Sequence, residues 1–475
     1  MTVLPLANGF YQSESLPISN QECVNLYPVA QQAPALNQDN LFGTPGVEEL
    51  TSTGVVLQAN RGAHTKNDIA YFVNGGALYS LDRTFDVEGS PLFGTTLLGV
   101  IEGTGRVSIA NNTTQLLILV PGGKGYVYNE NDATPFQEIT DLDFRANGNP
   151  MYVVSIDNFF VFTTDTNKII RSDLNDGLSY DALAFGSAES DPDATVAPVT
   201  ANNQLWITGT VTTEGFQNIG GVGFNFQRNN VFLDKGCIAP LSLIKANQAF
   251  FMIGNGNNES PSVWQYDGTS FQKISTIAID AALRSYTDEE IKAVFGMYYA
   301  NKGEFFLIYT LPDTSFVYDL VTKKWHERRS LISDELTAWR VNSIITAYGK
   351  VIVGDSEDGR IGELSDKFYS EYSENIISSF SLQPFSSLKP FNIPYLELTM
   401  ESGVGNSVSE DPQVSLEISN NGKIFGDPRN RSIGRAGEFN KLIIWRRNGK
   451  ARRLLVLRFT VADCVKKVFA KLEAL

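Results

Sequence analysis

One pattern recurs seven times between Gly54 and Leu364: a short apolar strand, a polar turn and a second short apolar strand. Successive repeats begin 46, 42, 45, 46, 55 and 46 residues apart. A period in the forties that contains only strands is typical of a β-propeller, in which each repeat forms one blade. The pattern therefore predicts an all-β fold class built on a seven-bladed β-propeller. The turns that mark the repeats lie near Asn67, Thr113, Ser155, Thr200, Ala246, Asn301 and Ala347.

The central strand of each repeat is a near-continuous apolar run, such as 116–119 and 250–253. Such runs are expected because blades pack face to face and bury both sides of the strand. The strand before each central strand should line the propeller axis. These innermost strands are predicted at 55–59, 106–110, 152–156, 195–199, 241–245, 293–299 and 341–346.

Residues 1–40 are polar and contain four prolines, which predicts an extended N-terminal arm. Its apolar residues Phe10, Tyr11, Leu26 and Tyr27 should anchor the arm on another surface. The propeller is expected at 41–365. Its seventh repeat lacks a fourth strand, and the segment 47–51, just before the first repeat, could supply it, which would remove an open sheet edge.

The long step of 55 residues predicts an insertion with helices between the fifth and sixth repeats. Thr287 and Glu290 have the spacing of a capping box, in which each side chain satisfies the other's backbone N–H. The preceding segment 277–283 is predicted as a second short helix.

The repeat ends after Leu364, and residues 366–475 are predicted to form a separate β-sandwich. Its strands are expected near 376–380, 395–400, 414–418, 442–445, 454–461 and 465–472. Two Asn-Gly pairs, at 421–422 and 448–449, favour two-residue type I′ hairpins because both residue types tolerate positive φ.

Charge is distributed unevenly along the chain. Residues 421–475 contain 14 Lys or Arg and 4 Asp or Glu, whereas the first 420 residues contain 24 and 49. The sandwich is therefore basic and the rest of the chain is acidic. Such asymmetry indicates an interaction surface in the basic part.

Few residues suit catalysis or metal binding. There are only two histidines, and three distant cysteines without a CxxC pair, so the cysteines are predicted to be reduced thiols. The segments 121–125 and 355–359 superficially resemble phosphate and calcium loops, but they lack the required spacing and are predicted turns. No catalytic residue, cofactor or metal is predicted. No apolar run approaches the length of a membrane helix, so no membrane insertion is expected.

The most distinctive local feature is the basic run from 445 to 453. As a two-residue hairpin it would place Arg447 opposite Lys450, and Trp445 opposite Arg452 in a cation–π pair. Three interpretations remain open: a solvated face, a contact with an acidic protein, or a contact with DNA phosphates. The candidate interaction residues are Trp445, Arg446, Arg447, Lys450, Arg452 and Arg453.

Four motifs follow one another along the chain: Asn25-Leu26-Tyr27-Pro28, Gly105-Arg106-Val107-Ser108, Arg284-Ser285-Tyr286-Thr287 with Glu289 and Glu290, and the run 445–453. Together they resemble the packaged-DNA-stabilisation proteins of short-tailed bacteriophages, also called tail hub or head-completion proteins. The resemblance extends from the arm to the C-terminal region, with wide divergence between the motifs.

This resemblance implies a structural protein of the virion tail without catalysis, assembled in the host cytoplasm. Such proteins form a homo-oligomeric ring, expected to be a hexamer, beneath the portal and its adaptor ring protein. They seal the channel, retain packaged DNA, and anchor a tail needle and tailspike or fibre proteins until genome ejection. The alternative is a propeller that binds or hydrolyses bacterial surface glycans, which would place converging acids and arginines at the axis.

Overall fold

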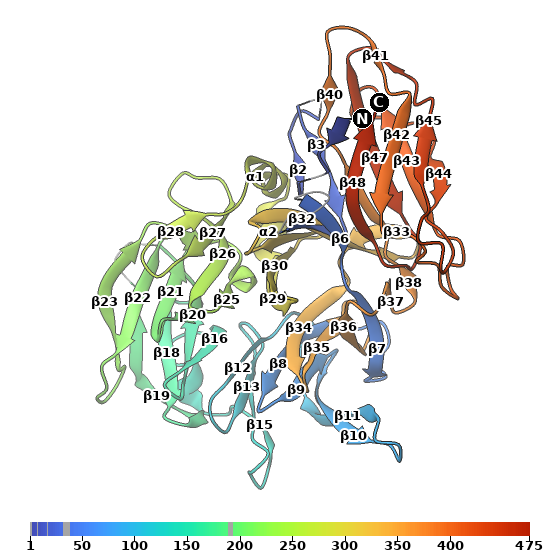
Figure 1. The fold of residues 1–475 in the computed structure, drawn as a ribbon. Helices are drawn as coiled ribbons and strands as arrows, with labels where there is room; N and C mark the ends of the chain where they lie inside the picture. The colour runs from blue at the N-terminus through green and yellow to red at the C-terminus, as the bar shows by residue number, and fades with distance from the viewer. Residues whose placement is uncertain (1, 7, 17, 32–38, 189–192) are drawn as a thin grey trace.

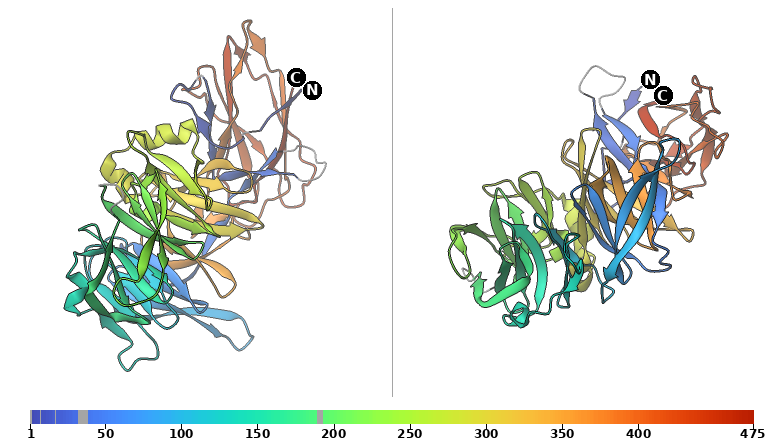
Figure 2. Two further views of the ribbon diagram at one scale, coloured as in Figure 1. Left: turned by 90° about the vertical axis from the view of Figure 1, so that its left-hand side faces the viewer. Right: turned by 90° about the horizontal axis from the view of Figure 1, so that it is seen from below.

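The computed structural model describes residues 2–6, 8–16, 18–31, 39–188 and 193–475, and these form a β-propeller and a β-sandwich (Figure 1). Both further views keep the sandwich to one side of the propeller (Figure 2). The expected all-β fold, with a propeller followed by a C-terminal sandwich, is therefore confirmed.

The first four repeats each fold into a four-stranded antiparallel sheet in which the strands follow chain order. The first strand of each sheet is the innermost, so each repeat forms one blade from the axis outward. These blades are β8 (Asn60–Lys66), β9 (Ile69–Asn74), β10 (Ala77–Phe85), β11 (Pro91–Val100); β12 (Ser108–Asn111), β13 (Leu116–Leu119), β14 (Gly125–Tyr128), β15 (Phe136–Glu138); β16 (Pro150–Ile156), β17 (Phe159–Thr164), β18 (Lys168–Asp173), β19 (Asp176–Ser187); β20 (Thr195–Ala201), β21 (Gln204–Gly209), β22 (Thr213–Asn218), β23 (Phe226–Leu233).

Three further sheets follow in the described part of the chain, in line with the seven repeats. They are β24 (Gly236–Cys237), β25 (Ile244–Ala246), β26 (Ala249–Asn255), β27 (Ser262–Tyr266), β28 (Phe271–Lys273); β29 (Phe295–Asn301), β30 (Glu304–Thr310), β31 (Ser315–Asp319), β32 (Lys324–Ile332) with β33 (Glu335–Ala338); β34 (Val341–Ala347), β35 (Lys350–Asp355), β36 (Arg360–Ser365).

The central strands are buried on both faces, as the apolar runs predict. In β17, Phe160 and Phe162 pack with residues of the preceding blade, while Val161 between them packs with residues of the following blade. Alternate side chains of one strand point to opposite faces, so a single apolar run fills two blade interfaces.

The ring is closed by a strand from before the first repeat, as predicted. Strand β7 (Gly46–Ser52) pairs antiparallel with β36, and Val47 lies opposite Leu364. The pairing gives the last blade its fourth strand and covers an edge that would otherwise be open.

Two predicted inner strands are placed wrongly. The strand predicted at 55–59 is a connection, and β8 begins only at Asn60, because Val56 and Leu57 are exposed and Leu57 has a φ of 54°. In the fifth blade a short 3-10 helix (Pro240–Ser242) occupies the start of the predicted 241–245 strand, so β25 begins at Ile244.

Both predicted helices are present between the fifth and sixth blades: α1 (Ile277–Arg284) and α2 (Asp288–Ala293). The capping box forms at α2, where Thr287 accepts from the backbone N–H of Glu290 and the Glu290 carboxylate accepts from that of Thr287. Local sequence alone therefore fixes where this helix begins.

The sandwich consists of two packed sheets, and strands from the N-terminal segment complete both. In one sheet, N-terminal β1, β5 and β6 join the C-terminal strands; in the other, β4 joins β32 of the sixth blade to β39. The strands of the two sheets are β1 (Thr2–Leu4), β5 (Leu26–Ala30), β6 (Asp39–Gly43), β42 (Tyr395–Met400), β45 (Ile443–Arg446), β48 (Val468–Ala474); β4 (Cys23–Val24), β39 (Ser378–Ser381), β40 (Phe385–Ser386), β43 (Gln413–Ser419), β44 (Arg429–Ser432), β47 (Leu454–Val461).

Three pairs of two-residue strands complete or flank these sheets. Strand β37 adds to the seventh blade through β7, and β41 pairs with β46 near the top of the sandwich in Figure 1. The short strands are β2 (Tyr11–Gln12), β3 (Asn20–Gln21), β37 (Ser370–Glu371), β38 (Glu374–Asn375), β41 (Phe391–Asn392) and β46 (Lys450–Ala451).

Asn25 joins the N-terminal segment to both domains. It is buried at a φ of 53°, its side-chain amide donates to the carbonyls of Arg329 and Ile377, and its side-chain oxygen accepts from the N–H of Arg329. Arg329 belongs to the propeller and Ile377 to the sandwich. The Asn25-Leu26-Tyr27-Pro28 motif therefore lies where propeller and sandwich meet.

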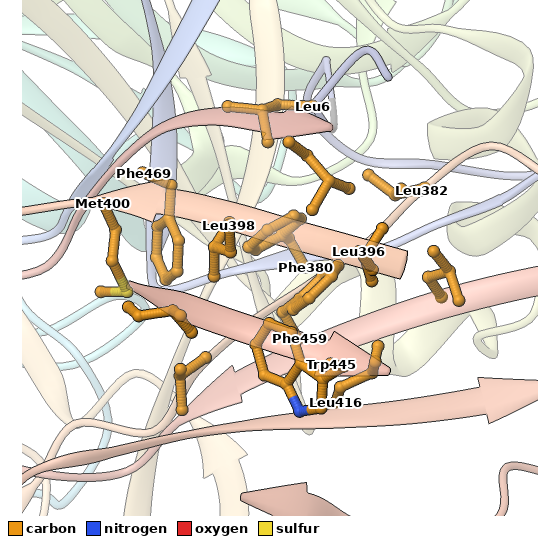
Figure 3. Packing of buried hydrophobic residues seen from close by; sticks show 14 of the residues in the cluster. Leu6, Phe380, Leu382, Leu396, Leu398, Met400, Leu416, Trp445, Phe459 and Phe469 are labelled. Carbon is orange, nitrogen blue, oxygen red and sulfur yellow. The ribbon is translucent and has the colours of Figure 1, made fainter. Parts of the chain in front are cut away.

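The anchors expected in the N-terminal segment are largely buried. Phe10 packs on Phe316 of the sixth blade with ring centres 5.0 Å apart, Leu26 lies in the sandwich core, and Tyr27 lies among buried residues of the sixth and seventh blades. Tyr11 is exposed. Figure 3 shows the sandwich core, where Leu6 packs with residues of the C-terminal strands.

The three cysteines are free thiols, as predicted, and all three are buried. Within the described ranges, no helix has the length and apolar character needed to cross a bilayer.

Candidate interaction surface at the tip of the sandwich

The basic run 445–453 does not form the predicted hairpin. Strand β45 pairs with β42 in one sheet of the sandwich, β46 pairs with β41 in a separate two-stranded ladder, and β47, which follows, belongs to the other sheet. The segment therefore crosses from one sheet of the sandwich to the other. Arg447 and Gly449 adopt positive φ values of 57° and 82°. Arg447 therefore does not face Lys450 across a two-stranded ladder. The hairpin predicted at the other Asn-Gly pair, 421–422, is also wrong. Residues 420–428 form a longer connection between β43 and β44.

Trp445 lies in the core and not on the surface. Its side chain is fully buried, packs edge-on against Phe459 with ring centres 5.7 Å apart, and donates its indole N–H to the Arg429 carbonyl at 2.6 Å (Figure 3). The predicted cation–π pair with Arg452 is therefore wrong, because burial of the indole directs it away from that arginine. Trp445 anchors the segment instead of contacting a partner.

Arg429 braces the segment from the neighbouring strand β44. Its guanidinium donates to the Asn448 side-chain oxygen and to the Arg446 carbonyl, both at 2.7 Å. Asn448 is buried and donates in turn to the Trp445 carbonyl at 3.3 Å. Sequence reasoning missed Arg429 because no local pattern links it to a segment 17 residues away.

Five cations of the run remain on the surface: Arg446, Arg447, Lys450, Arg452 and Arg453. We call these five residues the basic tip. Figure 1 shows β41, the partner of β46, at the end of the sandwich farthest from the propeller. The tip therefore projects away from the acidic propeller.

The cations of the basic tip are clustered without counter-charges, whereas several other cations of the sandwich are paired. Elsewhere in the sandwich Arg458 pairs with Glu417, Lys466 with Glu401 and Lys471 with Glu473, each at 2.9 Å. Among the described residues, no ion pair to a carboxylate is found for the five tip cations; Arg446 lies 6.0 Å from the Tyr395 ring centre. Like charges held together without counter-charges favour an anionic partner.

Other residues that the sequence singled out have internal partners. Asp355, in the calcium-like segment, is buried and accepts two hydrogen bonds from Arg340, at 3.0 and 2.7 Å. Arg284 forms a 2.6 Å ion pair with Glu14 of the N-terminal segment. In the described ranges, no group of three or more His, Cys, Asp or Glu residues has the arrangement of a metal site.

The propeller axis contains a cavity of about 590 Å³. The glycan alternative would place acids and arginines there. Arg106 and Lys245 line the cavity, but Asp and Glu are absent from the described residues that line it.

Two family models together cover almost all of the chain. The model described as Bacteriophage P22 Gp10, beta-propeller, matches residues 2–369, and the one described as Bacteriophage P22 Gp10, beta-sandwich, matches residues 389–475. The chain belongs to the P22 Gp10 family. The family match agrees with the resemblance found in the four sequence motifs, and it identifies the chain as a structural protein of a phage tail.

A member of the P22 Gp10 family, the tail hub protein gp10 of Salmonella phage P22, is 23% identical over 411 residues. The match covers 84% of this chain and 83% of the relative. Among solved structures, the WD40 β-propeller domain of Doa1 matches at 10% identity with a TM-score of 0.40, over 68% of this chain and 97% of that one. PorZ of Porphyromonas gingivalis matches at 10% identity with a TM-score of 0.41, over 67% of this chain and 38% of that one.

Proposed function

We propose that this protein is a ring-forming tail hub of a short-tailed phage. Six copies close the channel beneath the portal and its adaptor ring protein, retain the packaged DNA, and anchor the tail needle and the tailspikes or fibres. The ring is assembled in the host cytoplasm and becomes part of the virion tail. Support comes from the family match and from the relative's name as a tail hub.

The basic tip is the single observation that best supports this role. It is a cluster of exposed cations without counter-charges at one pole of a protein whose first 420 residues are strongly acidic. Opposite charge at the two ends orients a subunit during assembly and disfavours wrong pairings. We assign the tip to contact with an anionic component of the tail, either an acidic protein surface or the DNA phosphates.

The test is a charge reversal of Arg446, Arg447, Arg452 and Arg453 to Glu in the phage. All four side chains are exposed, so the variant should fold normally. We expect particles that package DNA but lose it before ejection, measured as a drop in the fraction of full particles by sedimentation and a fall in infectivity. A matched control reverses Lys292, Lys323, Lys367 and Arg435, which are exposed and lie outside the tip, with the same change in net charge.

Full particles and normal infectivity in the tip variant would contradict the proposed role of the tip. An equal loss of full particles and infectivity in the control variant would show that DNA retention depends on net charge and not on the position of the tip. Binding of the purified protein to duplex DNA separates the two anionic partners. A DNA contact predicts an affinity that falls steeply with salt, with a shallower slope in the tip variant.

A further inference from the structure

The axial cavity of the propeller is closed at one end by Arg106. This residue precedes β12 in the second blade, yet its guanidinium lies 3.6 Å from the ring centre of Phe295 in the sixth blade. It also donates to the Asn342 carbonyl of the seventh blade at 2.6 Å. These contacts require the side chain to extend across the axis. Since all three residues lie at or before the starts of inner strands, Arg106 forms the floor of the cavity.

The other end of the cavity carries polar groups near the ends of the inner strands. Thr200, Ser155 and Asn111 line it there, and the exposed Lys245 donates to the Thr200 hydroxyl at 3.2 Å. His64 also lines the cavity and shares a 2.7 Å hydrogen bond with Asn111, and burial lowers the pKa of His64. The imidazole is thus neutral at pH 7, and Arg106 and Lys245 supply the positive charge.

The cavity contrasts in charge with the domain around it. The first 420 residues contain twice as many acidic as basic side chains, but the described lining has two cations and no Asp or Glu. Asp68 and Asp157 lie in nearby turns, where each carboxylate already accepts a hydrogen bond, from the Tyr348 N–H and the Asn218 amide respectively. A concave site of one charge concentrates its field on an ion of the opposite charge.

Arg106 itself lacks a compensating anion. Its Nη1 is enclosed and finds no hydrogen-bond partner in the described part of the chain. Burial lowers the pKa of Arg106 to about 9, with no neighbouring carboxylate opposing that effect. Arg106 is half-buried. A partly desolvated cation without an anionic partner is unfavourable, and an anion bound in the cavity would offset this cost.

We propose that the axial cavity binds a small molecule that carries an oxyanion, either a phosphate or a carboxylate. Its volume of about 590 Å³ lies within the usual range of small-molecule sites. Arg106 at the floor and Lys245 at the open end provide the charge, and the hydroxyls and amide at the open end provide orienting hydrogen bonds. This site is independent of the tail-hub role and of the basic tip.

The experiment measures binding to the full chain by calorimetry and thermal shift. The probes are inorganic phosphate, glucose 1-phosphate and glucuronate, with glucose as the neutral comparison. We expect at least one anion to bind and raise the melting temperature while glucose does not. Stronger binding of either glucose 1-phosphate or glucuronate identifies the source of the oxyanion as phosphate or carboxylate.

Two variants locate the site. Lys245→Glu changes an exposed residue, so it should fold normally and weaken anion binding at least tenfold. Arg106→Gln tests the floor and should weaken binding similarly, provided its circular dichroism is unchanged. Lys292→Glu, outside the cavity, should bind as the unmodified protein does. The proposal is overturned if no anion binds at millimolar concentration, or if Lys245→Glu binds as well as Lys292→Glu. The tip charge reversal should leave anion binding unchanged.

Discussion

Glu327 is a carboxylate buried at the junction of propeller and sandwich. It lies on β32, accepts from the Thr314 hydroxyl at 3.0 Å, and is 3.7 Å from the Arg329 guanidinium. Burial raises the pKa of Glu327 to about 7, against the opposing effect of Arg329. Burial also raises the pKa of the nearby Glu22, and Arg458 and Glu417 line the same groove. The buried Glu327 carboxyl, beside Glu22, thus makes this junction sensitive to pH.

The sign of this effect follows from the direction of the shift. The folded protein holds a proton on Glu327 up to about pH 7, whereas the unfolded chain releases it near the ordinary value of 4.5. The contribution of Glu327 to the free energy of unfolding is therefore most favourable at low pH. It is lost as pH rises from 4.5 to 7, by an amount on the order of 3 kcal/mol.

Glu327→Gln should flatten this dependence. We compare the free energy of unfolding in urea of the variant with that of the unmodified protein at each pH. This difference should favour the variant more at pH 8 than at pH 4.5, by about 1–3 kcal/mol. Glu335→Gln is the matched control, because Glu335 is exposed on the adjacent β33. An identical pH profile for Glu327→Gln and Glu335→Gln would contradict the assigned shift.

At the scale of elements, the short strand β7 connects the two ends of the propeller sequence. It comes from before the first repeat, completes the last blade, and also pairs with β37 after the propeller. Val47 is buried among residues of the seventh blade and its neighbours, while Glu48 and Glu49 on the same strand are exposed. One strand therefore closes the ring and also pairs with the segment that follows the propeller.

Val47→Asp should open this closure. The new carboxylate would be buried without a partner, so we expect a loss of about 3 kcal/mol or more, measured as a lower denaturant midpoint. Glu49→Gln on the same strand should change stability by less than about 0.5 kcal/mol. Limited proteolysis should cut Val47→Asp first near the unpaired edge of the seventh blade. A midpoint like that of Glu49→Gln would show that β7 is dispensable.

At the scale of the whole molecule, the sandwich is built from both ends of the chain. Thr2 lies opposite Ala474 in the β1–β48 pair, and the two termini lie side by side in Figure 1. β4 then connects the sixth blade to the sandwich through β32 and β39. The N-terminal segment therefore holds the two domains together as one unit.

We expect residues 376–475 alone not to fold cooperatively, because they lack the strands that β1, β4, β5 and β6 supply. Joining residues 1–45 after Leu475 through a short Gly-Ser linker should restore a folded domain, since these ends already adjoin. The measurement is thermal unfolding by circular dichroism, with a scrambled 1–45 segment as the control. Cooperative unfolding of 376–475 alone would contradict this dependence.

The five cations of the run are exposed, and their contact with a partner stays a prediction, whereas the predicted hairpin backbone is wrong. Asn448-Gly449 is locally suited to a hairpin, but the core position of Trp445 and the braces from Arg429 place the segment between two sheets. These contacts join strands that the sequence does not mark as neighbours. A local turn preference worth about 1 kcal/mol does not compete with burial of a tryptophan.

The sequence by itself determined the propeller, its closing strand, the capped helix and the uneven charge. Each of these depends on a periodic or local pattern, because side-chain alternation and hydrogen bonding between near neighbours act over a few residues. Only the tertiary structure decided how the N-terminal segment enters the sandwich, how Asn25 joins two domains, and how Arg106 crosses the axis. Those contacts join residues that are far apart in the sequence, and no local pattern marks such residues as neighbours.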